Sequence, residues 1–348
     1  PVLPGVAWPL MPGDPLPHLT SWSADWSGLN VAVCGLGEVG FSIADTLHEL
    51  GAVVRVHARA PSGDSGTILN VLGVDLVEYP DDDQLVEGVR GSEPELVVLS
   101  ADWKPEWDVE RKLWELPATI WSDVEFAWRV ADKNAARPKI VLLGGVDAAR
   151  IADIAQGVLL HAGRRAARAG TDAPPILDII RHPEPVELVL WSLSARQLWR
   201  MGHQGHTRRN PVLSCGIDDD GLTLELVQAL YAHTELFCLY RRTGGTTEKG
   251  LERAYVVEGA RAIGVGVDTP GMSDLGVVDG IVCDRAFLDD RRERALELCT
   301  VAELEGAGQT TPHHVLQALA AFAIARALDV TPELIGGALQ AHPGLFDN

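Results

Sequence analysis

The stretch Leu-Asn-Val-Ala-Val-Cys-Gly-Leu-Gly-Glu-Val-Gly, residues 29–40, decides the fold. Its first half is a short apolar run with β-branched residues, closed by Gly35, which is typical of a buried parallel strand. Residues 42–50 continue with helical spacing and end at Gly51, a residue favoured just after a helix. A strand joined to a helix by a glycine-rich turn predicts a Rossmann-like, doubly wound parallel sheet.

The rest of the chain repeats this alternation of strands and helices. Further strands are expected at 53–57, 96–100, 118–121, 139–143, 188–191 and 211–215, with a hairpin at 277–284. Helices are expected at 148–169, 314–328 and 331–340.

The polar segment 131–138 ends in proline and predicts a linker. We therefore expect a Rossmann-like domain at 21–137 and a second α/β domain at 138–348. A flexible arm is expected at 1–20, which is rich in proline.

Charge and composition exclude several classes of function. The formal net charge of -20 opposes binding to nucleic acid or to an anionic membrane surface. No apolar run approaches the roughly 18 residues of a membrane span, so no membrane insertion is expected. The five cysteines are scattered, with no Cys-x-x-Cys pair, which argues against disulfides and zinc and indicates a reducing cytoplasm.

Gly35, Gly37 and Gly40 form a Gly-x-Gly-x-x-Gly turn between the first strand and helix. Such a turn lets backbone N–H groups face a phosphate. A nicotinamide site also needs a carboxylate at the end of the second strand, and residues 56–59 (Val-His-Ala-Arg) contain none. Arg55 or Arg59 could instead face a 2′-phosphate. The turn is interpreted as a packing device, as a site for another phosphate-bearing ligand, or as a dinucleotide site.

Gly144 and Gly145 stand between a strand and a helix, at the position of a P-loop. A working P-loop needs a lysine for the outer phosphates and a hydroxyl for magnesium. Residues 144–150 have neither, and Arg150 is their only cation. The sequence therefore predicts a degenerate P-loop.

No metal site and no catalytic residue is assigned from the sequence. Asp218, Asp219 and Asp220 are interpreted as part of a turn, and His203 and His206 as part of a glycine-rich loop. No combination of nucleophile and base can be paired from one sequence.

Taken together, several stretches resemble the Mur ligase family, and within it the UDP-N-acetylmuramoyl-L-alanine:D-glutamate ligases. They keep their order along nearly the whole chain and lie at 19–22, 25–40, 120–128, 256–264, 275–280, 284–287 and 313–328. The resemblance implies a Rossmann-like domain that binds a UDP-sugar at Gly35, Gly37 and Gly40. It also implies a central domain that binds ATP at residues 144–150 and His313.

The sequence departs from the family at most positions that the resemblance marks as functional. The hydroxyl residue that meets the UDP phosphate corresponds to Val39, and the acidic residue that meets uracil corresponds to Ala58. The magnesium-binding glutamate corresponds to Ser192, and the carbamylated lysine falls near His233 or Thr234.

Two further departures concern the nucleotide and the chain length. The family's His-Asn-x-x-Asn segment keeps His313, whereas His314 and Gln317 replace the asparagines, and the histidines of the segment at 218–223 are missing. The family's third domain would begin where the sequence ends, at Asn348.

These departures lead to three hypotheses for the function. The first is a catalytically degenerate scaffolding or regulatory protein linked to peptidoglycan precursor synthesis, with a protein partner or a second copy and no cofactor. The alternative is residual ATP-dependent ligase activity, or weak binding of ATP with magnesium or of a UDP-sugar, completed by another chain. A remote alternative is an NADP-binding oxidoreductase.

Overall fold

The computed structural model describes residue 14 and residues 16–60, 63–134, 137–203, 210–218, 221–308, 311–342 and 344. These residues form two compact units. The first contains the described residues up to Arg137 together with Pro175–Pro183 and His203. The second contains Pro138–Pro174, Glu184–Gly202 and the described residues from Asn210 onward.

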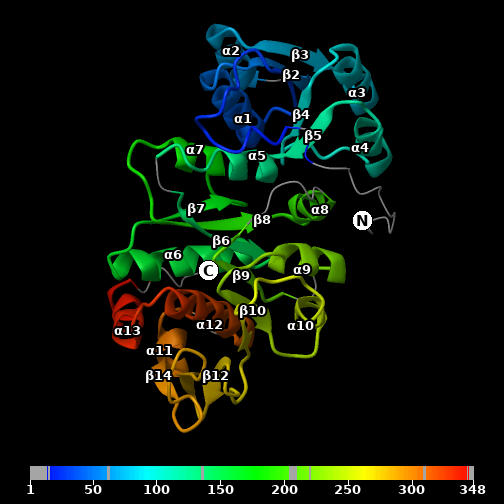
Figure 1. The fold of residues 1–348 in the computed structure, drawn as a ribbon. Coiled ribbons are helices and arrows are strands. Elements are labelled where there is room, and N and C mark those ends of the chain that lie inside the picture. Colours follow the sequence, from blue (N-terminus) through cyan, green and yellow to red (C-terminus); the bar gives the residue numbers. More distant parts are fainter. Residues whose placement is uncertain are drawn as a thin grey trace. The chain divides into compact units, whose positions relative to one another are not determined.

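The first unit is built on a five-stranded parallel sheet in the order β3-β2-β1-β4-β5 (Figure 1). The strands are β1 (Asn30–Cys34), β2 (Val53–Arg59), β3 (Asp75–Tyr79), β4 (Leu96–Leu99) and β5 (Thr119–Ser122). The helices are α1 (Glu38–Glu49), α2 (Gly63–Leu72), α3 (Asp82–Gly91), α4 (Trp107–Trp114), α5 (Asp123–Arg129) and α7 (Ile176–Arg181). From β1 the chain adds β2 and β3 on one side, and then β4 and β5 on the other side of β1. This confirms the predicted doubly wound sheet.

Two segments remote in sequence complete the first unit. Helix α7 lies against α1, where Arg181 pairs with Asp45 at 2.6 Å and with Glu49 at 2.9 Å. At the other end of the chain, Leu19 is buried, although residues 1–20 were expected to be a flexible arm. Residues 1–13 and 15 of that arm lie outside the described residues.

The second unit is built on a nine-stranded sheet in the order β14-β13-β12-β11-β10-β9-β6-β8-β7. Its strands are β6 (Lys139–Gly144), β7 (Ala166–Gly170), β8 (Leu188–Leu193), β9 (Leu213–Gly216), β10 (Phe237–Arg241), β11 (Arg261–Val265), β12 (Asp274–Val278), β13 (Ile281–Asp284) and β14 (Leu296–Thr300). Strands β12, β13 and β14 pair antiparallel, and the other pairs are parallel. The predicted α/β class is confirmed in both units.

Helices α6, α12 and α13 pack together beside the second sheet (Figure 1). The helices of this unit are α6 (Ala148–His161), α8 (Ala195–His203), α9 (Leu224–Tyr231), α10 (Thr246–Leu251), α11 (Val301–Gly306), α12 (Pro312–Ala327) and α13 (Pro332–Ala341). Helix α12 is rich in alanine and buried over most of its length, so its small side chains allow close packing against α6 and the sheet. None of the described helices has the length and apolar character needed to cross a membrane.

The helix expected at 148–169 is shorter in the structure. The structure ends α6 at His161, and Gly163 follows with a φ of +77°, which favours glycine. Residues 166–170 form β7, which pairs in parallel with β8 at the edge of the sheet. Pairing with a remote strand has here overridden the helical preference of the alanines.

Candidate functional site

Close contacts require all three glycines of the first turn: Gly35 and Gly37 face the loop that follows β4, and Gly40 faces the turn itself. A Cβ at Gly35, whose φ is +96°, would lie 2.5 Å from the Cβ of Trp103. A Cβ at Gly37 would lie 2.5 Å from the carboxyl carbon of Asp102, and one at Gly40 would lie 2.1 Å from the carbonyl oxygen of Gly35. The turn therefore has the packing role that was one of its three interpretations.

The backbone N–H groups of this turn already hold an anion that belongs to the chain itself. The Asp102 carboxylate accepts hydrogen bonds from the backbone N–H groups of Val39, at 2.8 Å, and Gly40, at 3.0 Å. The Ser100 hydroxyl donates to the same oxygen at 3.2 Å. Asp102 thus occupies the N-terminus of α1, where backbone N–H groups and the helix dipole favour a phosphate. Asp102 was not predicted from the sequence, where its only signal is its position after a strand next to β1.

The end of β2 has neither a carboxylate for the ribose of a dinucleotide nor an arginine without an acidic neighbour. Arg55 pairs with Asp75 at 3.1 Å and Arg59 with Asp82 at 3.2 Å, so each of the two candidate partners of a 2′-phosphate has an acidic neighbour. Ala58 is buried, and no carboxylate follows it on the strand.

His57, also on β2, is buried beside Tyr79. Its Nδ1 lies 3.0 Å from the Tyr79 hydroxyl, and the two rings stack. Burial, with a contribution from the charge of Arg55, lowers the pKa of His57 from 6.5 to about 4.

The free energy of unfolding should therefore fall as the pH drops from about 6.5 to about 4. In this window the unfolded chain protonates His57 and the folded chain does not, so acid favours the unfolded state. The contribution is about 3 kcal/mol across the window. Urea denaturation at several pH values, for the protein and for His57→Gln, would measure it. If the free energy of unfolding of the two proteins depended on pH in the same way, the prediction would be contradicted.

In the second unit, the turn after β6 lies where the sheet changes winding direction. From β6 the chain runs to β7 at one edge, returns to β8 beside β6, and then crosses to β9 on the other side. In open α/β sheets, ligands bind at the carboxyl ends of strands at such a point. Gly144 ends β6, and Gly145 has a φ of +107°.

A carboxylate of the chain also contacts this second turn. Asp218 accepts hydrogen bonds from the backbone N–H groups of Val146 and Gly221, both at 3.1 Å, and its side chain is largely buried. Asp218 was interpreted as one of three aspartates in a turn. Asp219 and Asp220 lie outside the described residues, as does His206 of the loop beyond His203.

The helix that follows the turn is linked to α12. The Asp147 carboxylate lies 3.1 Å from Nε2 of His313 and accepts a hydrogen bond from the Gln317 amide at 2.8 Å. Arg150, expected to supply positive charge to the turn, pairs with Asp153 at 3.1 Å one turn further along α6. The structure therefore brings His313 close to the second turn, whereas Arg150 forms an ion pair within α6.

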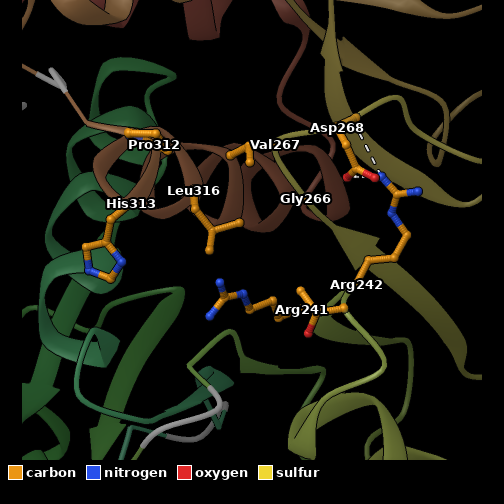
Figure 2. Close-up of a pocket in the computed structure, with 9 residues that line it drawn as sticks. Arg241, Arg242, Gly266, Val267, Asp268, Pro312, His313 and Leu316 are labelled. Atoms are coloured by element: carbon orange, nitrogen blue, oxygen red, sulfur yellow. Dashed lines mark hydrogen bonds and ion pairs between the residues drawn. The ribbon is translucent and has the colours of Figure 1, made fainter.

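A pocket of about 330 Å³ opens beside His313 (Figure 2). Its walls come from the ends of β10 and β11 and from the start of α12. The lining residues are Arg241, Arg242, Thr243, Gly266, Val267, Asp268, Pro312, His313 and Leu316. Arg241 and Arg242 were not predicted from the sequence, because the residues around them carry no motif.

Two further positions that the resemblance marked, Ser192 and Thr234, are buried and hydrogen-bonded within the protein. The Ser192 hydroxyl is buried and donates to the carbonyl oxygens of Ala169 and Thr171. The Thr234 hydroxyl is also buried, and it lies 2.8 Å from the Ser214 hydroxyl. Within the part of the chain that the structure describes, no group of three or more His, Cys, Asp or Glu side chains could hold a metal ion.

Comparisons with known proteins identify relatives over most of the chain. The sequence is 39% identical over 345 residues to the UDP-N-acetylmuramoylalanine-D-glutamate ligase of Leifsonia xyli subsp. xyli, covering 94% of this chain and 66% of that protein. It is 33% identical to the ligase of the same name from Tropheryma whipplei and 34% identical to that from Streptomyces avermitilis. These matches cover 92% and 91% of this chain and 68% of each relative. The chain thus spans about two thirds of the length of these relatives.

Structural comparison gives the same fold. The murein peptide ligase Mpl of Psychrobacter arcticus 273-4 aligns with a TM-score of 0.50 and 14% identity, over 90% of this chain and 68% of that one. A scan against models of protein families finds no match.

These findings correct the first functional hypothesis. Relatives 33–39% identical over more than nine tenths of the chain are named as ligases, so the interpretation as a catalytically degenerate scaffold is wrong. Nothing in the comparisons supports an oxidoreductase. The chain belongs to the Mur ligase family, with the UDP-N-acetylmuramoylalanine-D-glutamate ligases as its relatives.

Proposed function

We propose that this protein takes part in the ATP-dependent joining of UDP-N-acetylmuramoylalanine to D-glutamate. The observation that carries the proposal is the identity of 33–39% with ligases of that name over 91–94% of the chain. Under this proposal, the first unit binds the UDP-sugar at the turn of Gly35, Gly37 and Gly40. The second unit binds the nucleotide near Gly144, Gly145 and His313. The five cysteines are free and buried, in keeping with a cytoplasmic reaction.

The geometry of the second unit supports a nucleotide site. The turn after β6 lies at the carboxyl end of a central parallel strand, where backbone N–H groups can face phosphates. His313 contacts this turn through Asp147 and also lines the pocket, so the turn and the pocket are neighbours. ATP supplies the energy of the amide bond by activating the substrate carboxylate, and the chain's part is to bind and orient.

The second unit fits magnesium less well than it fits phosphate. Ser192, at the position that the resemblance marks for a metal-binding glutamate, is buried and donates to backbone carbonyls. We therefore assign no described residue to magnesium.

The test is a reconstitution with the purified chain, Mg-ATP, UDP-N-acetylmuramoylalanine and radiolabelled D-glutamate. We expect phosphate release that depends on both substrates, together with transfer of label to the UDP-sugar. L-Glutamate in place of D-glutamate is the matched control and should give neither. A folded sample that neither turns over nor binds the UDP-sugar in calorimetry would contradict the proposal.

A further inference from the structure

The pocket beside His313 is basic, although the chain as a whole carries a formal net charge of -20. Two consecutive arginines, Arg241 and Arg242, line one wall. The opposite side includes Pro312 and His313 from the first turn of α12, whose N-terminus contributes a partial positive charge. Asp268 is the one acidic residue among the lining residues.

The two arginines differ in what they contact. Arg242 pairs with Asp268 and lies 3.4 Å from Asp274, so its charge is neutralised within the protein. Arg241 forms no ion pair with any residue that the structure describes. Figure 2 shows its guanidinium extending away from Arg242, toward the side of the pocket where His313 lies. A guanidinium without a counterion in a pocket is suited to an anion, and above all to phosphate oxygens.

Arg241 lies at the same edge of the sheet as the turn after β6. Arg241 ends β10, which is separated from β6 by β9 alone, so both strands end at the same edge of the sheet. His313 lines the pocket with Arg241 and contacts Asp147, which stands at the N-cap position of α6 just after the glycines. Residues 144–150 contain no lysine to meet the outer phosphates of a nucleotide.

We propose that Arg241 binds the phosphates of the nucleotide and supplies the positive charge that residues 144–150 lack. This inference rests on the proposed function, because the anion is taken to be the triphosphate of the ligase's ATP. The pocket volume of about 330 Å³ lies at the lower end for ligand sites, which suits a polyphosphate chain better than a whole nucleotide. His313, whose Nε2 faces the Asp147 carboxylate, lines the other side of the pocket.

The experiment is a calorimetric titration of the full chain with Mg-ATP and, separately, with inorganic tripolyphosphate. Arg241→Gln should weaken binding of both by about 10-fold to 100-fold, the range for loss of a charge-assisted hydrogen bond. Arg241→Lys should retain part of the affinity because the charge remains. Arg253→Gln, an exposed arginine outside the pocket lining, should bind like the parent protein.

The outcomes separate this proposal from the proposed function. Binding that Arg241→Gln leaves unchanged, or a parent protein that binds neither anion, would overturn the role of Arg241. The ligase proposal would then still be decided by UDP-sugar binding and D-glutamate transfer. Loss of tripolyphosphate binding in Arg241→Gln, in a protein that performs no transfer, would support the phosphate site and count against the ligase. Circular dichroism of each variant verifies folding, and none of these substitutions removes an ion pair between described residues.

Discussion

Replacing Arg129 with methionine should lower the free energy of unfolding of the first unit by about 3–5 kcal/mol, the usual result of breaking a buried ion pair from one side. Arg129 is fully buried, and its guanidinium lies 2.9 Å from Glu125 and 2.7 Å from Asp14. It also donates to the carbonyl oxygens of Leu16 and Leu19.

The loss of stability should be large because the groups that Arg129 contacts stay buried after the substitution. Glu125 is 0% exposed, and without Arg129 its charge loses an ion pair that offsets part of its desolvation. The guanidinium also stacks over the Trp121 ring, with 4.0 Å from its carbon to the ring centroid. The carbonyls of Leu16 and Leu19 would each lose one donor as well.

Urea denaturation followed by tryptophan fluorescence would measure this effect, since most of the tryptophans lie in the first unit. Arg90→Met is the matched control, because Arg90 is exposed and pairs with Glu87 within one helix, where the expected change is below about 1 kcal/mol. Arg129→Met combined with Glu125→Gln should recover part of the loss. A single Arg129→Met change that costs no more than Arg90→Met would contradict the prediction.

Replacing Asp102 with alanine should strengthen binding of UDP-N-acetylmuramoylalanine by about 10-fold to 100-fold. The Asp102 carboxylate occupies the backbone N–H groups of Val39 and Gly40, which the proposed function assigns to a phosphate of the UDP-sugar. A ligand phosphate must displace this carboxylate, and hydrogen bonds to a charged group contribute about 1.5–3 kcal/mol. The same change should destabilise the free protein by about 1–2 kcal/mol, because α1 loses the anion at its N-terminus.

Two further variants separate charge from hydrogen bonding at this position. Asp102→Asn keeps an oxygen that can accept from the same N–H groups but removes the negative charge, so its affinity should fall between those of the parent and Asp102→Ala. Asp108→Ala removes an exposed carboxylate of α4 and should leave UDP-sugar binding unchanged. Calorimetry with UDP-N-acetylmuramoylalanine provides the measurement. Weaker binding by a folded Asp102→Ala protein would show that this turn is not the phosphate site.

Strands, turns and helices whose signals lie within a few neighbouring residues were predicted from the sequence. Residues 29–40 predicted the first strand, its glycine turn and the helix that follows, because apolar patterning and glycine backbone preferences act over a few residues. The hairpin of β12 and β13 was predicted for the same reason, since Asp279 and Gly280 both adopt positive φ at its turn. The stretches 120–128 and 313–328 also indicated the family, which the relatives confirm.

Contacts between residues remote in sequence were decided by the tertiary structure alone. Asp102 lies more than sixty residues from the N–H groups that it accepts from, and Asp218 more than seventy from Val146. Strand β7 exists because β8 is beside it, and Arg241 faces His313 because β10 and α12 border one pocket. The sequence by itself determined the α/β pattern, the glycine turns and the family. Which side chains meet those turns followed only from the order of strands in the sheets, because parallel strands bring loops far apart in the chain to one edge.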